Sequence, residues 1–165
     1  MMSRSRVSFT HLLDQNQTYW PETATGLSLI APAIYRLHEH LSRLAEQLFT
    51  ARGLQSAEFE ALCALRTSPP PHRMTPTELY RLLLVSSGGM TKILVRLEDK
   101  GLIARPDNPR DARSREVALT PRGKSLIEEV TEELLQQEAR LVALIDQPEA
   151  LQQSLISWLQ KVEQD

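Results

Sequence analysis

The chain has 165 residues, of which 41% are hydrophobic, 5% aromatic and 24% charged, with a formal net charge of −2. This length and composition fit one domain with a mainly aliphatic core. The single cysteine, Cys63, excludes an intramolecular disulfide. No apolar run approaches the roughly 20 residues that span a bilayer. We therefore expect a cytoplasmic protein that makes no membrane contact.

The net charge conceals an uneven distribution. Residues 73–124 contain eleven Lys and Arg against six Asp and Glu, a local charge of +5, whereas the rest of the chain carries −7. Such asymmetry indicates an anionic partner for the middle of the chain. A basic surface that is merely solvated is the alternative, and charge alone does not exclude it.

The N-terminal third is expected to be helical after a polar start. Residues 1–20 are mixed and loosely ordered, with a short helical turn at 9–15. Apolar residues recur at three- and four-residue steps and predict a helix over 26–51. A second helix is predicted over 56–67, with Ser56 as its N-cap.

Two short helices with clear start signals follow. Thr75 can cap a helix over 76–84, and Glu78 can reach back to close a capping box. After a turn of about three residues, another helix is predicted over 87–100, ended by Gly101. Two helices joined by so short a turn have helix-turn-helix spacing.

The period then changes from helical to extended. The runs 102–106 and 115–120 predict a two-stranded hairpin, whose tip is rich in turn formers and arginine. A long helix to about residue 145 follows, capped by Thr120. A last helix begins at Pro148 with Asp146 as its cap.

The order of these elements predicts a mainly α fold with a small β hairpin, which is a winged helix-turn-helix. The helix over 87–100 fits the major groove of DNA. Met90, Leu94 and Leu97 share its buried face. The residues left for solvent or DNA are Ser87, Gly88, Thr91, Lys92 and Arg96.

Two further features fit a phosphate-rich partner. Gly88 and Gly89 lie at a helix N-terminus, where the backbone can approach a phosphate, although glycines that only ease packing are the alternative. The hairpin arginines suit phosphates or a narrow minor groove, and they are Arg110, Arg113 and Arg115.

The segment "MTPTELYRLLLVSSGGMTKILVRLEDKGLIAR" and the wing "DARSREVALTPRG" resemble the MarR family of bacterial transcriptional regulators. The resemblance implies one domain over 1–165, with dimerisation helices in 1–54 and 121–165 and a DNA-binding lobe in 55–120. It also implies a homodimer on a pseudo-palindromic operator of double-stranded DNA, usually as a repressor. Asp111 would orient the wing, and Arg113 would enter the minor groove.

The family resemblance further implies a small-molecule pocket between the dimerisation helices and the DNA-binding lobe. A subgroup that shares "SSGGMT", with some urate-responsive members, has an aspartate and an arginine where this chain has Glu60 and Ile93. Loss of that arginine removes a fork for an anionic ligand, which favours an aromatic or hydrophobic effector. The candidate ligand-binding residues are Trp20, Tyr35, His38, Glu60, Cys63 and Ile93.

Other classes of function find less support in the sequence. There is no nucleophile elbow, P-loop or paired-cysteine motif, so we expect no enzyme and no cofactor. His38 and His40 are two residues apart on a helix and cannot share a metal. Cys63 fits an inert buried thiol better than a redox sensor. A winged-helix module that binds protein or RNA is the remaining alternative.

Overall fold

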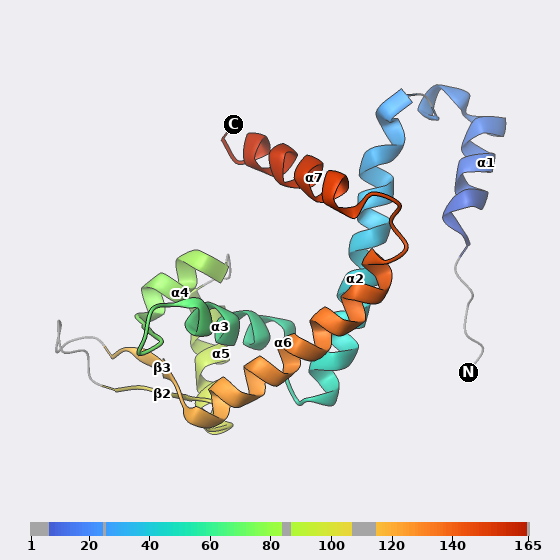
Figure 1. Cartoon of the computed structure of the whole chain (residues 1–165). Helices are drawn as coiled ribbons and strands as arrows, with labels where there is room; N and C mark the ends of the chain where they lie inside the picture. The colour runs from blue at the N-terminus through green and yellow to red at the C-terminus, as the bar shows by residue number, and fades with distance from the viewer. Residues whose placement is uncertain (1–6, 25, 84–86, 107–114, 165) are drawn as a thin grey trace. The chain divides into compact units, whose positions relative to one another are not determined.

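The computed structural model describes residues 7–24, 26–83, 87–106 and 115–164 (Figure 1). The chain divides into two compact units, Met1–Leu44 and Ala45–Asp165, which are described separately below. The fold is mainly helical with one small antiparallel sheet, so the predicted fold class is confirmed.

The first unit is more regular than the sequence indicated. Helix α1 spans Phe9–Tyr19, and the Ser8 hydroxyl caps it by accepting a hydrogen bond from the N–H of His11 at 3.1 Å. Two 3-10 turns follow, η1 over Pro21–Thr23 and η2 over Gly26–Leu29. Because η2 occupies the expected first turn, α2 begins at Ile30 and ends at Ala51, within the second unit.

The helix-turn-helix region follows the predicted boundaries closely. Helix α3 spans Ser56–Thr67, α4 spans Pro76–Leu83 and α5 spans Ser87–Asp99. The predicted cap of α4 is confirmed, since the N–H of Thr75 donates to Glu78 Oε2 at 2.7 Å.

The predicted cap of α3 was off by one residue. Gln55, not Ser56, is the N-cap, because its N–H donates at 2.9 Å to the carboxylate of Glu58. Glu58 stands three residues after Gln55, which is the spacing that a capping box requires.

The wing contains one strand more than predicted. Strands β2 (Ile103–Ala104) and β3 (Val117–Leu119) form the expected pair, but β1 (Arg73–Met74) joins the other edge of β3. The order is therefore β1-β3-β2. The strand that leads into α4 is thus tied to the wing.

The C-terminal helices are α6, Pro121–Val142, and α7, Pro148–Val162. Thr120 caps α6 as predicted, accepting from the N–H of Gly123 at 3.0 Å. The cap predicted for α7 was wrong, because Gln147 occupies that position and makes no side-chain cap bond. None of the residues in α7 is buried.

The hydrophobic core of the second unit surrounds α3, which contacts α4, α5, α6 and β3 (Figure 1). The rings of Phe49 and Phe59 stack beside it with centroids 4.1 Å apart. The largest fully buried apolar side chains are Leu62, Leu65, Leu79, Leu94, Leu97, Leu102, Ile127, Val117 and Val130. No helix among the described residues is long and apolar enough to cross a membrane.

The start of α6 lies so close to the turn between α5 and β2 that only glycine fits there. A Cβ added to Gly123 would be 2.0 Å from the carbonyl oxygen of Leu102. Because the obstacle is backbone, α6 would have to move to accommodate any side chain. At Gly88 an added Cβ would meet no atom within 4 Å among the described residues.

We predict that Gly123→Ala lowers the free energy of unfolding by about 1–3 kcal/mol or more, since overpacking against backbone forces a shift. Gly88→Ala is the matched control, and it should leave stability unchanged or raise it by at most about 1 kcal/mol. Urea unfolding followed by circular dichroism measures both. Equal stability of the two variants would contradict the close approach.

Candidate nucleic-acid interface

Helix α5 has one buried face and one open face. Met90, Leu94 and Leu97 are buried as predicted, and Ile93 joins them at 4% exposure. The exposed positions follow the other side of the helix at helical spacing, and they are Gly88, Thr91, Lys92, Val95, Glu98 and Asp99. The first part of this face, up to Val95, therefore has mostly small side chains and one cation, whereas its end is acidic.

Val95 was not among the residues selected from the sequence. Its side chain is 47% exposed, although valine normally favours burial. It stands four residues after Thr91, so the two side chains are neighbours on the helix surface. The available signal was its spacing of four residues from Thr91, since the prediction assigned Val95 to neither face.

The glycines at the start of α5 were given two interpretations, and the geometry separates them at Gly88. Because no described atom occupies the space of a Cβ there, tight packing does not require this glycine. Its exposed position in the N-terminal turn fits the interpretation that the backbone approaches a phosphate there. Ser87 is part of the helix, but its side chain lies outside the described residues.

Arg96 is positioned differently from its neighbours on the predicted face. Its Nε donates to Glu58 Oε1 at 2.9 Å, which joins α5 to α3. Lys100 Nζ donates to the other carboxylate oxygen at 2.6 Å. Arg96 thus has a partner within the protein, and its contact with DNA stays a prediction. We call Glu58, Arg96 and Lys100 the Glu58 cluster.

The Glu58 carboxylate is fully buried, at 0% exposure, yet it remains the charged form. Burial raises its pKa, but hydrogen bonds from Lys100, from the backbone of Gln55 and from Arg96 outweigh this effect and hold the pKa below its ordinary value. The ion pair is therefore present throughout the neutral pH range.

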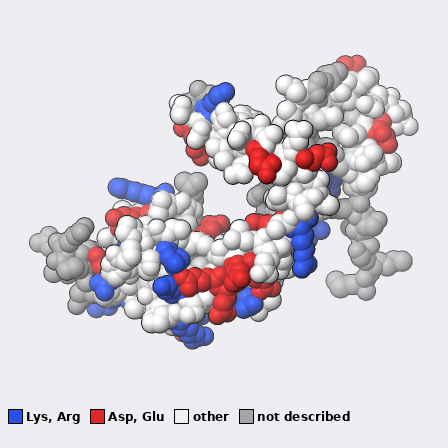
Figure 2. Space-filling view, in the orientation of Figure 1, with Lys and Arg blue, Asp and Glu red and all other residues white. Residues whose placement is uncertain are grey.

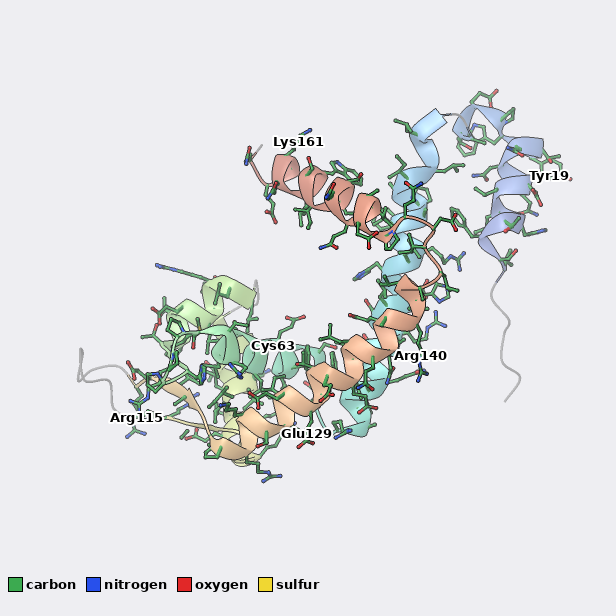
Figure 3. All side chains as sticks on the ribbon, viewed as in Figure 1. Tyr19, Cys63, Arg115, Glu129, Arg140 and Lys161 are labelled. Atoms are coloured by element: carbon green, nitrogen blue, oxygen red, sulfur yellow. The ribbon has the colours of Figure 1, made fainter. Side chains whose placement is uncertain are left out.

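The structure describes only some of the residues that are predicted to form the wing. Arg115 is exposed at the end of the sheet where the chain enters β3 (Figure 3). Arg110, Asp111 and Arg113 lie outside the described residues, so their positions stay predictions. At the base of the wing, Arg105 Nε lies 3.4 Å from the Glu98 carboxylate.

Acidic side chains gather over α6 (Figure 2). In the sequence, α6 is separated from α5 by the wing. Two of them hold arginines in ion pairs, Arg52 with Glu133 at 2.6 Å and Arg66 with Glu128 at 2.7 Å. Among the described residues, no acid forms an ion pair with Lys92. In the structure, the acidic residues therefore gather on α6, whereas α5 presents an exposed cation.

A cavity of about 1240 Å³ opens between α3, the segment 68–72 and α6. Its lining is mostly apolar, and Cys63, His72, Ile127 and Leu135 contribute to it. Figure 3 shows Cys63 on the side of α3 that faces α6. Burial raises the pKa of the Cys63 thiol, which favours the unreactive protonated form.

Of the six predicted ligand-binding residues, only Cys63 lines this cavity. Glu60 is exposed on α3, and Ile93 packs in the core instead of lining a pocket wall. Trp20, Tyr35 and His38 are exposed residues of the first unit. Three of the six thus belong to the first unit and three to the second, and their shared role stays a prediction. The described residues contain no cluster of three potential metal ligands.

These features define the class of protein. A helix-turn-helix is joined to a wing, and its second helix presents an exposed face, so the chain is a winged helix-turn-helix protein. A sequence model described as the MarR family matches residues 52–114. The chain belongs to the MarR family.

Two relatives of known sequence support this family assignment. The multiple antibiotic resistance protein MarR of Salmonella typhimurium is 34% identical over 96 residues, which are 58% of this chain and 65% of that protein. An HTH-type transcriptional regulator of Bacillus cereus is 30% identical over 108 residues, or 66% of this chain and 69% of that protein. The chain thus spans less than two thirds of the Salmonella protein.

Among solved structures, a mutant MarR from Escherichia coli complexed with operator DNA superimposes with a TM-score of 0.65 and 26% identity. The match covers 89% of this chain and 96% of that one. The relatives are named as transcriptional regulators, a class of protein without catalytic activity.

Proposed function

We propose that this protein is a sequence-specific transcriptional regulator that binds double-stranded operator DNA, with α5 in the major groove. One observation carries the proposal. The face of α5 opposite the core is exposed, and its N-terminal part consists of Gly88, Thr91, Lys92 and Val95. A hydroxyl, an ammonium and a methyl-rich side chain are groups that read base edges and thymine methyls.

The wing completes the proposed contact with DNA. Arg113 enters the minor groove, Asp111 orients the wing, and Arg110 and Arg115 contact phosphates. The pairing of β1 with β3 supports this arrangement, because it ties the wing to the strand that leads into α4. Like the family generally, the protein acts as a repressor.

The protein acts as a homodimer. Support comes from α7, in which six large apolar residues are exposed by 42–58%. They are Leu151, Leu155, Ile156, Trp158, Leu159 and Val162. Most of them follow one another at three- and four-residue steps and form a helical stripe, which a monomer would leave in water. A two-fold dimer covers such a face and offers two α5 helices to a pseudo-palindromic site.

A small aromatic or hydrophobic effector releases the operator. The cavity between α3 and α6 supports this part of the proposal, because it is large enough for a small molecule and mostly apolar. The Arg66–Glu128 ion pair lies in its wall, so the guanidinium is already neutralised. That pairing disfavours a polar anion such as urate, which would need the guanidinium as its partner.

We predict that Lys92→Ala weakens binding to a duplex selected from a random pool. The slope of log affinity against log salt should become shallower by about one, because one ammonium no longer neutralises a phosphate. Lys161→Ala removes the same charge from α7 and is the control, with no expected change. Fluorescence anisotropy at several salt concentrations measures both. Unchanged affinity and slope in Lys92→Ala would place the recognition surface elsewhere.

Sedimentation equilibrium should show a dimer at micromolar concentration. Leu155→Glu and Leu159→Glu together put two charges on the apolar face of α7, so this double variant should sediment as a monomer and bind the operator more weakly. Gln152→Glu and Gln160→Glu are exposed positions of the same helix and form the control pair. A monomeric parent protein would overturn the dimer and the two-half-site operator.

Titration of the protein–operator complex should release DNA at lower concentrations of salicylate-like acids or neutral aromatics than of urate. An effector in the cavity should also slow alkylation of Cys63, which is the only thiol and reacts slowly because burial raises its pKa. Release by urate at the lowest concentration would refute the apolar-effector argument. Release without protection of Cys63 would exclude this cavity.

A further inference from the structure

The Glu58 cluster holds two cations, Arg96 on α5 and Lys100 in the turn directly after it. Glu58 Oε1 accepts from Arg96 Nε at 2.9 Å, and Oε2 accepts from Lys100 Nζ at 2.6 Å. Lys100 Nζ also donates to the carbonyl oxygen of Gly53 at 2.8 Å. Both side chains are thus drawn toward α3 and the end of α2.

The spacing of these cations along α5 matters. Lys92, Arg96 and Lys100 follow one another at four-residue steps, and Lys100 directly follows the last residue of α5, so they start from one stripe along the helix and its end. Left in solvent, three cations on one stripe would form a strip suited to backbone phosphates. The buried carboxylate of Glu58 takes two of them, and among the described residues only Lys92 lacks an acidic partner on this stripe.

Contacts with phosphate strengthen binding to every DNA sequence alike. Regulation depends on the ratio of specific to non-specific affinity, because a genome offers a great excess of competing sites. Two cations withheld from phosphates therefore raise that ratio, even though they lower the total affinity.

We propose that Glu58 is a positioning residue for specificity, which holds Arg96 and Lys100 away from DNA phosphates so that α5 reads DNA through Thr91, Lys92 and Val95. This inference rests on the proposed function. A purely structural Glu58 would instead only hold α5 against α3, and its removal would weaken specific and non-specific binding together.

Glu58→Gln keeps the shape of the side chain and removes the charge that holds the two cations. In the full-length variant we expect affinity for a random-sequence duplex to rise at least threefold. Its salt slope should steepen by about one to two, one for each released cation that reaches a phosphate. The ratio of selected-site to random-site affinity should fall.

Glu46→Gln is the control, because it removes an exposed carboxylate of α2 that is not part of the Glu58 cluster. It should leave the salt slope unchanged. Glu58→Gln combined with Arg96→Ala and Lys100→Ala should return the slope to the parent value. Weaker or unchanged random-duplex binding in folded Glu58→Gln, with the parent slope, would overturn the proposal.

Lys100→Met tests the same idea in a chain that keeps Glu58 paired with Arg96. We expect unchanged random-duplex affinity and slope, whereas a slope reduced by about one would show that Lys100 contacts phosphate and would overturn the inference. If the parent protein shows no salt-dependent duplex binding, the proposed function itself fails. A parent that binds, with Lys92→Ala behaving as predicted, isolates any failure to Glu58.

Discussion

The burial of α3 is the constraint on which the second unit depends. This helix contacts α4, α5, α6 and β3, and Glu58 in its N-terminal turn is fully buried. The capping box places Glu58 in that turn, where an unpaired carboxylate would be very costly. Arg96 and Lys100 neutralise it, and the same contacts orient α5. One set of contacts therefore caps α3, neutralises the buried carboxylate and orients α5.

This arrangement explains why a chain with an excess of acids can present a DNA-binding surface. Part of the local positive charge of residues 73–124 is paired with acids of the same chain, as in the pairs Arg73–Glu116 and Arg105–Glu98. The acids of α6 pair with arginines of other segments. Little unpaired positive charge remains on the open face of α5. Such a face suits recognition of DNA by shape and hydrogen bonding more than by non-specific electrostatic attraction.

Local sequence patterns predicted the helices well, but they did not predict contacts between residues that are far apart in the sequence. The ends of α3 and the cap of α4 follow from residues three apart, so the sequence contains them directly. Strand β1 has only two residues, and its identity comes from β3, more than 40 positions later. Arg96 was assigned to the open face by helical spacing, but its partner is Glu58 on another helix. Periodicity also failed to reveal that Ile93 belongs to the core.

The three-stranded sheet has a consequence for the exchange of binding specificity between relatives. Because β3 is hydrogen-bonded to β1 on one edge and to β2 on the other, the hairpin is not a separable module. A chimaera that imported only the hairpin would join a foreign β3 to the native Arg73–Met74 edge. The smallest block that carries all its own strand partners runs from residue 73 to residue 119, and recombination within it would be selected against.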